Sequence, residues 1–331
     1  MLTYVLDVRD LSDVRFVLAP MSETALSLFH LNGTISTPAH LQRWQDNAQA
    51  QRDRYDHRLI SALIAPGPAI PDFLTPLPRP GVTRPSLDEG LTAIATTDPE
   101  LIHTQLQQLR EGGEPSPPLQ RLLDDGERAG PRIAGALERY HRVAIAPVWA
   151  AVNRILEADI TFRGRELAMG GPTQLFDSLA PQLAWDRDGR LRLDTAYAGE
   201  EGEFAAAGRG LTLMPSVFVT RLVSAYSPET AAPHVGYPAR GSATLAESTR
   251  VVPPGALRRL IGGAKADVLH ALVEPVAVGE LARRLEVSPS AVSQSLRVLY
   301  ENGLIDRARS GREVLYRRTP DGERLARGHR P

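Results

Sequence analysis

The sequence predicts an α+β protein that is mostly helical, with a small β-region and a separate C-terminal domain. Three observations predict this class: apolar residues recur at helical spacing through most of residues 1–165, they alternate with polar residues in short segments further on, and residues 256–331 combine short helical patterns with a hairpin pattern. The chain has 331 residues, which is more than one core usually serves. We expect a helical region at 1–165, a sheet-containing region packed on it at 166–250, and a C-terminal domain at 256–331.

Apolar residues at three-and-four spacing indicate five helices in the N-terminal region. The proline-rich stretch 65–85 interrupts them and predicts a loop or an extended crossover. Asp98-Pro99 is typical of a helix start, because aspartate caps free N–H groups and proline lacks one. Pro147 predicts a kink in the longest pattern. The predicted helices are Ser22–Leu31, Pro38–Arg52, Arg54–Ile64, Leu101–Arg110 and Pro131–Asp159.

Strand patterns begin after residue 160. Leu191–Thr195 alternates apolar and polar residues after an Asp-Gly turn, which is typical of a hairpin. Leu211–Thr220 is also strand-like, with Pro215 as an interruption or an edge position, and His234–Tyr237 is a shorter candidate. The run Val251–Gly255 (VVPPG) predicts a linker into the C-terminal domain.

The C-terminal domain begins with a helical pattern over Ala256–Val273 and continues with a second over Val278–Leu285. Val287 is expected to pack inward. Ser288-Pro289 then starts another helix, with the serine hydroxyl as the N-cap acceptor. Asn302-Gly303 predicts a left-handed end to this helix, and a strand follows at once.

At about 100° per residue, the helix that starts at Pro289 has an apolar side and a polar side. The apolar side, predicted to face the core, consists of Val292, Leu296 and Leu299. The opposite side consists of Ser290, Gln294, Arg297 and Glu301, with Ser293 on its flank. In the major groove of DNA, Gln can bind adenine and Arg can bind guanine through paired hydrogen bonds. We therefore expect Ser290, Ser293, Gln294 and Arg297 to face base edges.

Strand-forming residues flank the turn Ser310-Gly311, which predicts a hairpin. Two short helices followed by such a hairpin are the elements of a winged helix-turn-helix, in which the hairpin is the wing. Arg307, Arg309 and Arg312 lie around its predicted tip, where they can contact phosphates or the minor groove. We expect these contacts to add affinity and salt dependence but little sequence preference.

The distribution of charge favours the same interpretation. Residues 256–331 carry fourteen Arg and Lys against nine Asp and Glu, whereas residues 1–255 carry 24 against 30. A basic domain attached to an acidic body suits binding to the phosphate backbone. Two alternatives stay open: the arginines form an ordinary solvated surface, or the winged helix docks proteins without touching DNA.

The segment Ile261–Arg324, and above all residues 280–319 (ELARRLEVSPSAVSQSLRVLYENGLIDRARSGREVLYRRT), resembles the ArsR-like family of bacterial winged-helix transcription regulators. Residues 210–219 and 235–241 are similar to longer actinobacterial members that carry a large N-terminal domain. The resemblance implies a homodimer that binds an inverted repeat in double-stranded DNA, usually as a repressor released by an effector. For the N-terminal region we expect binding of a small organic effector, or dimerisation alone.

Metal-sensing members of this family place cysteines on the helix that matches Val278–Leu285, where this chain has Glu280 but no thiol. The chain contains no Cys, which excludes thiolate metal sites, thiol redox switches and disulfides. The eight histidines are dispersed, and only Asp53 with His57 forms a ligand pair at helical spacing, a pair that is more often a surface hydrogen bond. We expect no metal and no cofactor.

Motifs of catalysis are absent from the sequence: it has no GxSxG, HExxH or GxGxxG pattern, and Gly262–Lys265 lacks the spacing of a phosphate loop. We therefore do not expect an enzyme. The longest apolar run, Val143–Val152, is too short for a membrane span, and the N-terminus does not resemble a signal peptide, so a cytoplasmic location is expected. Tyr140, Trp149 and Phe162 are candidates to line an effector pocket, with core packing as the alternative for each.

Overall fold

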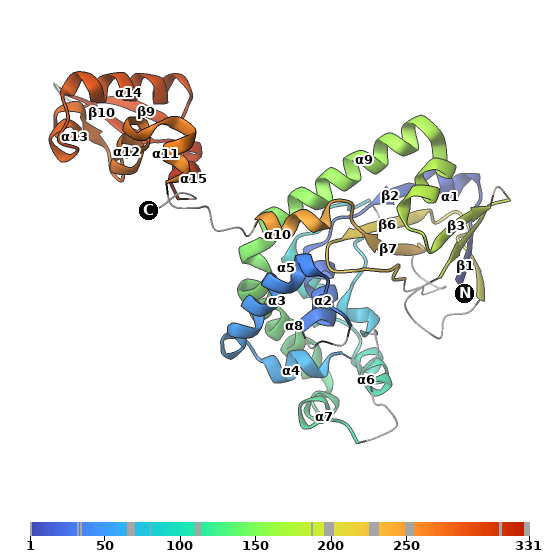
Figure 1. The fold of residues 1–331 in the computed structure, drawn as a ribbon. Helices are drawn as coiled ribbons and strands as arrows, with labels where there is room; N and C mark the ends of the chain where they lie inside the picture. Colours follow the sequence, from blue (N-terminus) through green and yellow to red (C-terminus); the bar gives the residue numbers. More distant parts are fainter. Residues whose placement is uncertain are drawn as a thin grey trace. The chain divides into compact units, whose positions relative to one another are not determined.

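The computed structural model describes residues 2–31, 33, 35–64, 70–79, 81–109, 114–186, 188–194, 202–224, 232–248, 255–310 and 313–327. They belong to two compact units, Met1–Thr249 and Arg250–Pro331 (Figure 1). Of the predicted linker, residues 251–254 lie outside the described residues. Helices predominate and the sheets are small, which confirms the mostly helical α+β class.

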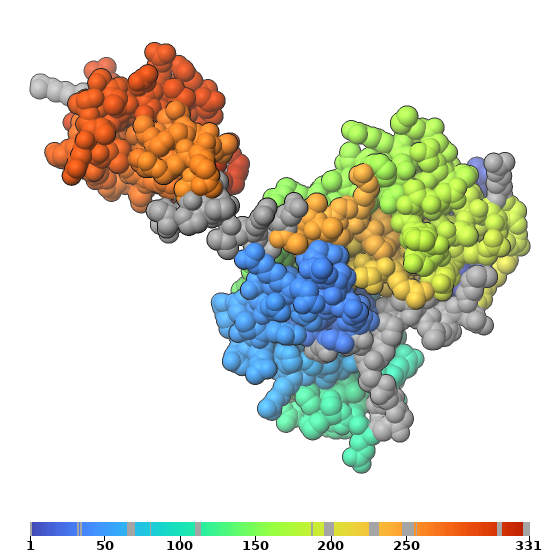
Figure 2. All heavy atoms as spheres, in the orientation of Figure 1, coloured from blue at the N-terminus to red at the C-terminus, as the bar shows by residue number. Residues whose placement is uncertain are grey.

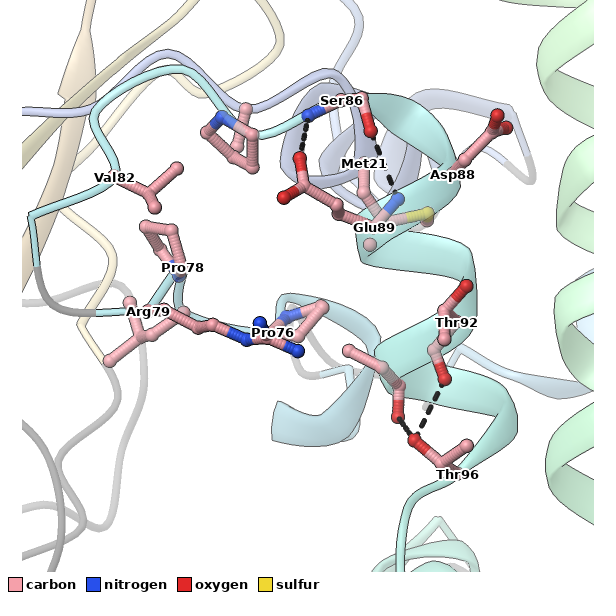
Figure 3. Close-up of a pocket in the computed structure, with 15 residues that line it drawn as sticks. Met21, Pro76, Pro78, Arg79, Val82, Ser86, Asp88, Glu89, Thr92 and Thr96 are labelled. Atoms are coloured by element: carbon pink, nitrogen blue, oxygen red, sulfur yellow. Dashed lines mark hydrogen bonds between the residues drawn. The ribbon is translucent and has the colours of Figure 1, made fainter.

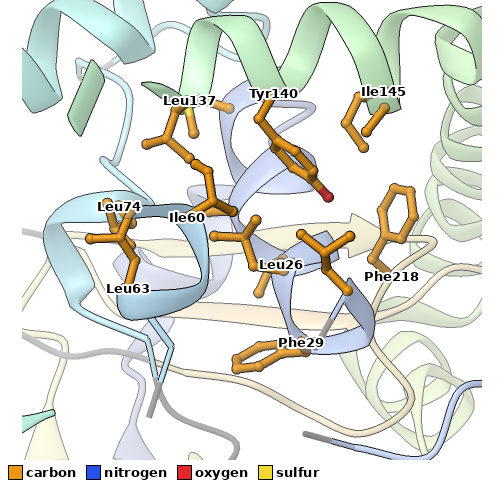
Figure 4. Close-up of a cluster of buried hydrophobic side chains, with 14 of the residues drawn as sticks. Leu26, Phe29, Ile60, Leu63, Leu74, Leu137, Tyr140, Ile145 and Phe218 are labelled. Carbon is orange, nitrogen blue, oxygen red and sulfur yellow. The ribbon is translucent and has the colours of Figure 1, made fainter. Parts of the chain in front are cut away.

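The first unit is built around helix α2 (Pro20–Leu31), of whose twelve residues eleven are buried. Side chains from neighbouring helices surround it and form a large hydrophobic core, in which Leu26 lies between Tyr140 and Phe29 (Figure 4). The other helices of this part are α3 (Ala39–Ala50), α4 (His57–Ala62), α5 (Leu87–Ala95), α6 (Pro99–Gln108), α7 (Pro117–Asp124) and α8 (Ala129–Tyr140).

Four of these helices, α2, α3, α4 and α6, correspond to predicted ones with shifted ends. Asp98 caps α6 as predicted, because its carboxylate accepts the Glu100 N–H at 2.9 Å. Helices α5 and α7 are not among the predicted ones. Helix α5 begins with a capping box, in which Ser86 and Glu89 each accept the backbone N–H of the other.

The longest predicted helix is two helices in the structure. After α8, a π-helical turn spans His141–Ile145, and α9 follows over Ala146–Leu179. The irregularity predicted at Pro147 is therefore present one turn earlier, because proline lacks an N–H and its ring clashes with the carbonyl four residues before it. Helix α9 also breaks at Gly171, where φ is 68°. None of the described helices, α9 included, is long and apolar enough to cross a membrane.

Helix α9 continues beyond the predicted end at Asp159. The prediction ends too early because the buried side of the helix becomes polar at this point. Asp159 and Arg163 are 1% and 5% exposed, with 3.6 Å between the Arg163 Nε and an Asp159 oxygen. Asp159 also accepts the Tyr237 hydroxyl at 2.6 Å and the Arg240 N–H at 2.9 Å. The apolar periodicity therefore stops while the helix continues.

Two small sheets complete the first unit. The three strands predicted near 191, 211 and 234 are present in them. The first sheet has the order β3-β4-β1-β5, and β5 is parallel to β1 while the other pairs are antiparallel. The second sheet has the order β2-β6-β7 and is parallel. The strands are β1 (Leu2–Val5), β2 (Val14–Phe16), β3 (Leu183–Asp186), β4 (Arg190–Leu193), β5 (Gly202–Ala205), β6 (Leu211–Ser216) and β7 (His234–Pro238).

The beginning of the chain belongs to these sheets, because strands β1 and β2 flank the short helix α1 (Val8–Ser12). Helix α9 crosses residue 165, and the short helix α10 (Leu245–Ser248) contacts both α3 and α9. The helical part and the sheets thus lie in one compact unit, Met1–Thr249.

The second unit has its own hydrophobic core and a three-stranded sheet with the order β8-β10-β9. The single helix predicted over Ala256–Val273 is wrong, since Gly262 breaks it with φ at 85°, a conformation that other residues rarely adopt. The elements are α11 (Ala256–Ile261), α12 (Gly263–Ala271), β8 (Val276–Ala277), α13 (Val278–Arg284), α14 (Pro289–Glu301), β9 (Ile305–Ser310), β10 (Glu313–Arg318) and α15 (Pro320–Arg327).

Candidate nucleic-acid interface

Helix α14 is fixed in the second unit by its apolar side. Val292, Leu296 and Leu299 are each 1% exposed, and the helix packs against α12, α13 and β9. The Ser288 hydroxyl caps its start by accepting an N–H of the first turn at 3.3 Å, and Gly303 follows its end with φ at 68°. The predicted start, end and register of this helix are therefore confirmed.

The opposite side of α14 is exposed and carries Arg297. The Arg297 side chain is 80% exposed and forms an ion pair with Glu301, with 3.2 Å between Nε and Oε1. An ion pair between two exposed side chains contributes about 1 kcal/mol or less. The guanidinium can therefore leave Glu301 for another acceptor without a large loss of stability.

Three further polar residues share this exposed side: Ser290, Ser293 and Gln294. The Ser293 hydroxyl donates to the Pro289 carbonyl at 2.8 Å, which leaves its oxygen free to accept. The Gln294 amide forms no hydrogen bond with any residue that the structure describes, so both its donor and its acceptor are available. The structure thus brings together the four residues predicted to face bases.

The hairpin beside α14 pairs residue by residue from Ile305 opposite Arg318 to Ser310 opposite Glu313. The residues between its strands, 311 and 312, lie outside the described residues, and with them the predicted contact residue Arg312. Arg307 and Arg309 are exposed on β9. Both described wing arginines therefore lie on the strand that follows α14 directly in the chain.

Tyr300 is a residue of this surface that the sequence analysis missed. It lies on the last turn of α14, is 42% exposed, and its ring centre is 4.6 Å from the guanidinium carbon of Arg307. A cation–π contact of this kind contributes about 0.5–1 kcal/mol at an exposed site. It joins the wing to the helix. The available signal was an aromatic residue one turn beyond Arg297 on the exposed half of the helix.

Several basic side chains of the second unit are used within it. Arg318 is only 11% exposed and donates to the carbonyls of Leu269 and His270 at the end of α12, both at 2.7 Å. Arg258, Arg284 and Arg324 form ion pairs with acidic residues of the same unit. The positive charge available to a partner is therefore smaller than the count of fourteen indicates.

Two expectations about individual residues are wrong. Val287 does not pack inward but is 46% exposed, because Glu286 before it has φ at 55° and turns the chain sharply between α13 and α14. Asp53 and His57 do not share a helix: Asp53 lies in the 3-10 turn Arg52–Arg54, and His57 is the first residue of α4. Within the described ranges, no three His, Asp or Glu side chains are grouped as metal ligands.

Two pockets of the first unit have volumes typical of small-ligand sites. One, of about 480 Å³, lies between the proline-rich segment 76–85 and helix α5, with Arg79 on one side and Glu89 and Thr92 on the other (Figure 3). The second, of about 570 Å³, is lined by residues of α4, α7 and α8. Their lining residues do not include the predicted Tyr140, Trp149 or Phe162.

These three aromatic residues contact different groups. Tyr140 is fully buried, and 2.8 Å separates its hydroxyl oxygen from that of Ser27. Trp149 is half-buried, with its ring centre 6.4 Å from that of His141. Phe162 lies under the Arg240 guanidinium at 4.3 Å. A role for them in ligand binding stays a prediction.

Comparison with known proteins finds similarity in the second unit. Residues 267–307 match the family model of the arsR family of bacterial regulatory proteins. Among solved structures, a cysteine-to-serine mutant of Lactococcus lactis ZitR is similar at 28% identity, with a TM-score of 0.19, over 19% of this chain and 47% of that protein. The chain thus spans about half the length of that structure. No curated protein matches the chain.

Proposed function

We propose that this chain is a sequence-specific DNA-binding transcription regulator, because residues 267–307 match the family model of arsR-type regulatory proteins, as the resemblance predicts. One observation carries the proposal: α14 buries its apolar side in a packed core and exposes Ser290, Ser293, Gln294 and Arg297 together. A helix that contacts DNA bases needs both an apolar side that is held rigidly in the core and a polar side that is free to bind.

The proposed contacts divide into two kinds. Arg297 binds guanine O6 and N7 and Gln294 binds adenine N6 and N7, with Ser290 and Ser293 beside them as short donors and acceptors. Arg307 and Arg309 neutralise phosphates and add affinity for any sequence, and Arg312 is assigned the same role from its place in the sequence.

The finer proposal is a cytoplasmic, non-enzymatic homodimer that binds an inverted repeat as a repressor. For two copies of α14 to enter successive major grooves, they must lie about 34 Å apart. A small organic effector bound to the first unit would change this spacing and release the DNA. The size of the first unit, 249 residues, supports a role beyond DNA binding.

Genome-wide mapping of bound sites followed by gel shifts on the mapped sequences tests the proposal. We expect enrichment of an inverted repeat and tighter binding to it than to random DNA of equal length. No enrichment and no shift at low salt would favour the second candidate, a winged helix that docks proteins.

The effector is tested separately, by a thermal-shift screen of small molecules paired with gel shifts on the mapped site. A compound that raises the melting temperature and weakens DNA binding supports release by an effector. If every stabilising compound leaves DNA affinity unchanged, the first unit serves dimerisation alone.

A further inference from the structure

In the first unit, α4 lies beside both α7 and α8 (Figure 1). Residues of these three helices line a basic pocket. On the surface of the protein, α7 is in direct contact with the segment that contains α4 (Figure 2). The pocket has a volume of about 570 Å³, within the range of small-molecule sites. Each of the three helices contributes one arginine to its lining: Arg58, Arg121 and Arg132.

The charge of this pocket is positive. Arg58 and Arg121 are exposed and form no ion pair with any residue in the described ranges, whereas Arg132 contacts Asp125 at 2.7 Å. Among the lining residues the one acid is Asp56, whose carboxylate accepts the Leu59 N–H at 3.1 Å as the cap of α4. The positive charge is notable because residues 1–255 carry more acidic than basic residues.

A neutral histidine adds to the lining. Burial lowers the pKa of His57, and the positive charge of Arg52 lowers it further. At neutral pH the imidazole is therefore uncharged, and its Nδ1 lies 3.4 Å from the Ser61 hydroxyl. It can bond an anionic ligand with a ring N–H without being charged itself.

Apart from Ser116, the remaining lining is apolar and includes Leu59, Ala62 and Pro118. A ligand with a hydrocarbon or aromatic body can cover these groups, and its anionic end can reach the guanidinium groups. Guanidinium binds carboxylate, sulfonate and phosphate oxygens through paired hydrogen bonds, and it is weakly hydrated compared with ammonium.

We infer that this pocket binds a small organic anion with an apolar body, and that Arg58 and Arg121 hold its charged group. The inference goes beyond the proposed function and requires no DNA. Where the proposed function also holds, such an anion is the class of effector that the first unit takes.

The test uses the full chain and two fluorescent dyes that share one ring system. 8-Anilinonaphthalene-1-sulfonate carries an anionic group, and N-phenyl-1-naphthylamine lacks it. We expect the anionic dye to bind one site per chain and to bind at least about tenfold more tightly than the neutral dye. Arg58→Gln and Arg121→Gln should each weaken the anionic dye by about tenfold and leave the neutral dye unchanged.

Arg139→Gln is the matched control. Arg139 is exposed on α8, about two turns from Arg132, and is not among the lining residues of the pocket. The variant should bind both dyes like the unchanged protein. Melting followed by tryptophan fluorescence verifies that each variant is folded.

Equal affinity for the two dyes would overturn the inference, and so would anionic-dye binding that neither Arg58→Gln nor Arg121→Gln weakens. The DNA-binding proposal is tested separately, by the gel shifts on mapped sites. A chain that shows the expected dye pattern but shifts no DNA refutes the proposed function and leaves the anion site intact.

Discussion

Glu23 permits a quantitative test of how α2 is buried. This carboxyl group is 2% exposed; its Oε2 accepts the Val217 N–H at 3.0 Å, and its Oε1 has no partner among the residues that the structure describes. Burial raises the pKa of Glu23 from its ordinary value of 4.5 to about 7, although hydrogen bonds from Ser216 and Val217 act in the opposite direction.

The sign of the effect follows from proton linkage. A carboxyl group with a higher pKa in the folded than in the unfolded chain destabilises the fold as the pH rises, because the unfolded chain releases its proton first. The loss starts near pH 4.5 and is complete above pH 7. The difference between the two pKa values corresponds to about 3 kcal/mol of unfolding free energy.

Two histidines act in the opposite direction in the same region. His30 contacts the Phe218 carbonyl at 2.8 Å and His40 bonds to the Val217 backbone. Burial lowers the pKa of both, so their protonation destabilises the fold as the pH falls below about 6.5. Both histidines remain in a Glu23 variant, and a comparison with the unchanged protein therefore isolates the carboxyl group.

Glu23→Gln removes the ionisable group and keeps an oxygen for the Val217 N–H. Relative to the unchanged protein, its unfolding free energy should increase by about 2.5 kcal/mol between pH 5 and pH 8. Urea titrations followed by tryptophan fluorescence measure this in the full chain, because all three tryptophans lie in the first unit. They are Trp44, Trp149 and Trp185.

Glu138→Gln, which removes an exposed carboxylate from α8, is the control for the loss of one charge. If the curves of Glu23→Gln and the unchanged protein ran parallel from pH 5 to pH 8, Glu23 would ionise normally. Such a result would refute the packing in which Glu23 of α2 is buried against the end of β6.

Three further predictions concern the second unit. Arg297→Ala should weaken binding to the mapped site by about 1–3 kcal/mol and random DNA by less; equal losses in gel shifts would refute base reading by this residue. Arg309→Ala should weaken all sequences alike and reduce the slope of log K against log salt by about one, and an unchanged slope would exclude a phosphate contact. Tyr300→Leu should lower DNA affinity through Arg307, so a double-mutant cycle with Arg307→Ala should give a coupling of about 0.5–1 kcal/mol, and strict additivity would contradict it. Arg142→Ala changes the same charge on the first unit and should leave all three measurements unaltered.

Local signals account for what the sequence predicts well. In the second unit, Ser288, Pro289 and Gly303 each determine one end of α14 through interactions within a few residues, and the apolar spacing then determines its register. Because the start, the end and the periodicity all agree, the exposed side of the helix can be predicted before any tertiary contact is known.

Tertiary interactions account for what the sequence does not show. Strands β1 and β2 are four and three residues long, and their partners β4, β5 and β6 follow about 190–200 residues later, too far apart for any local pattern to reveal. The continuation of α9 past Asp159 is hidden for a different reason, because a buried ion pair of Asp159 and Arg163 replaces the apolar residues of its inner side, and Asp159 accepts the Tyr237 hydroxyl of β7.

The basic pocket cannot be predicted from the sequence either, because its arginines are far apart in the chain and no local pattern connects them. Arg58, Arg121 and Arg132 are separated by 63 and 11 positions and lie on three helices, one of which, α7, was not predicted. Each arginine alone has the sequence signature of a solvated surface residue. Their meeting depends on α4 packing against α7 and α8, which the apolar faces of those helices determine. The residues that bury the core therefore also decide which exposed charges meet, and a ligand site of this kind becomes visible only after the helices are packed.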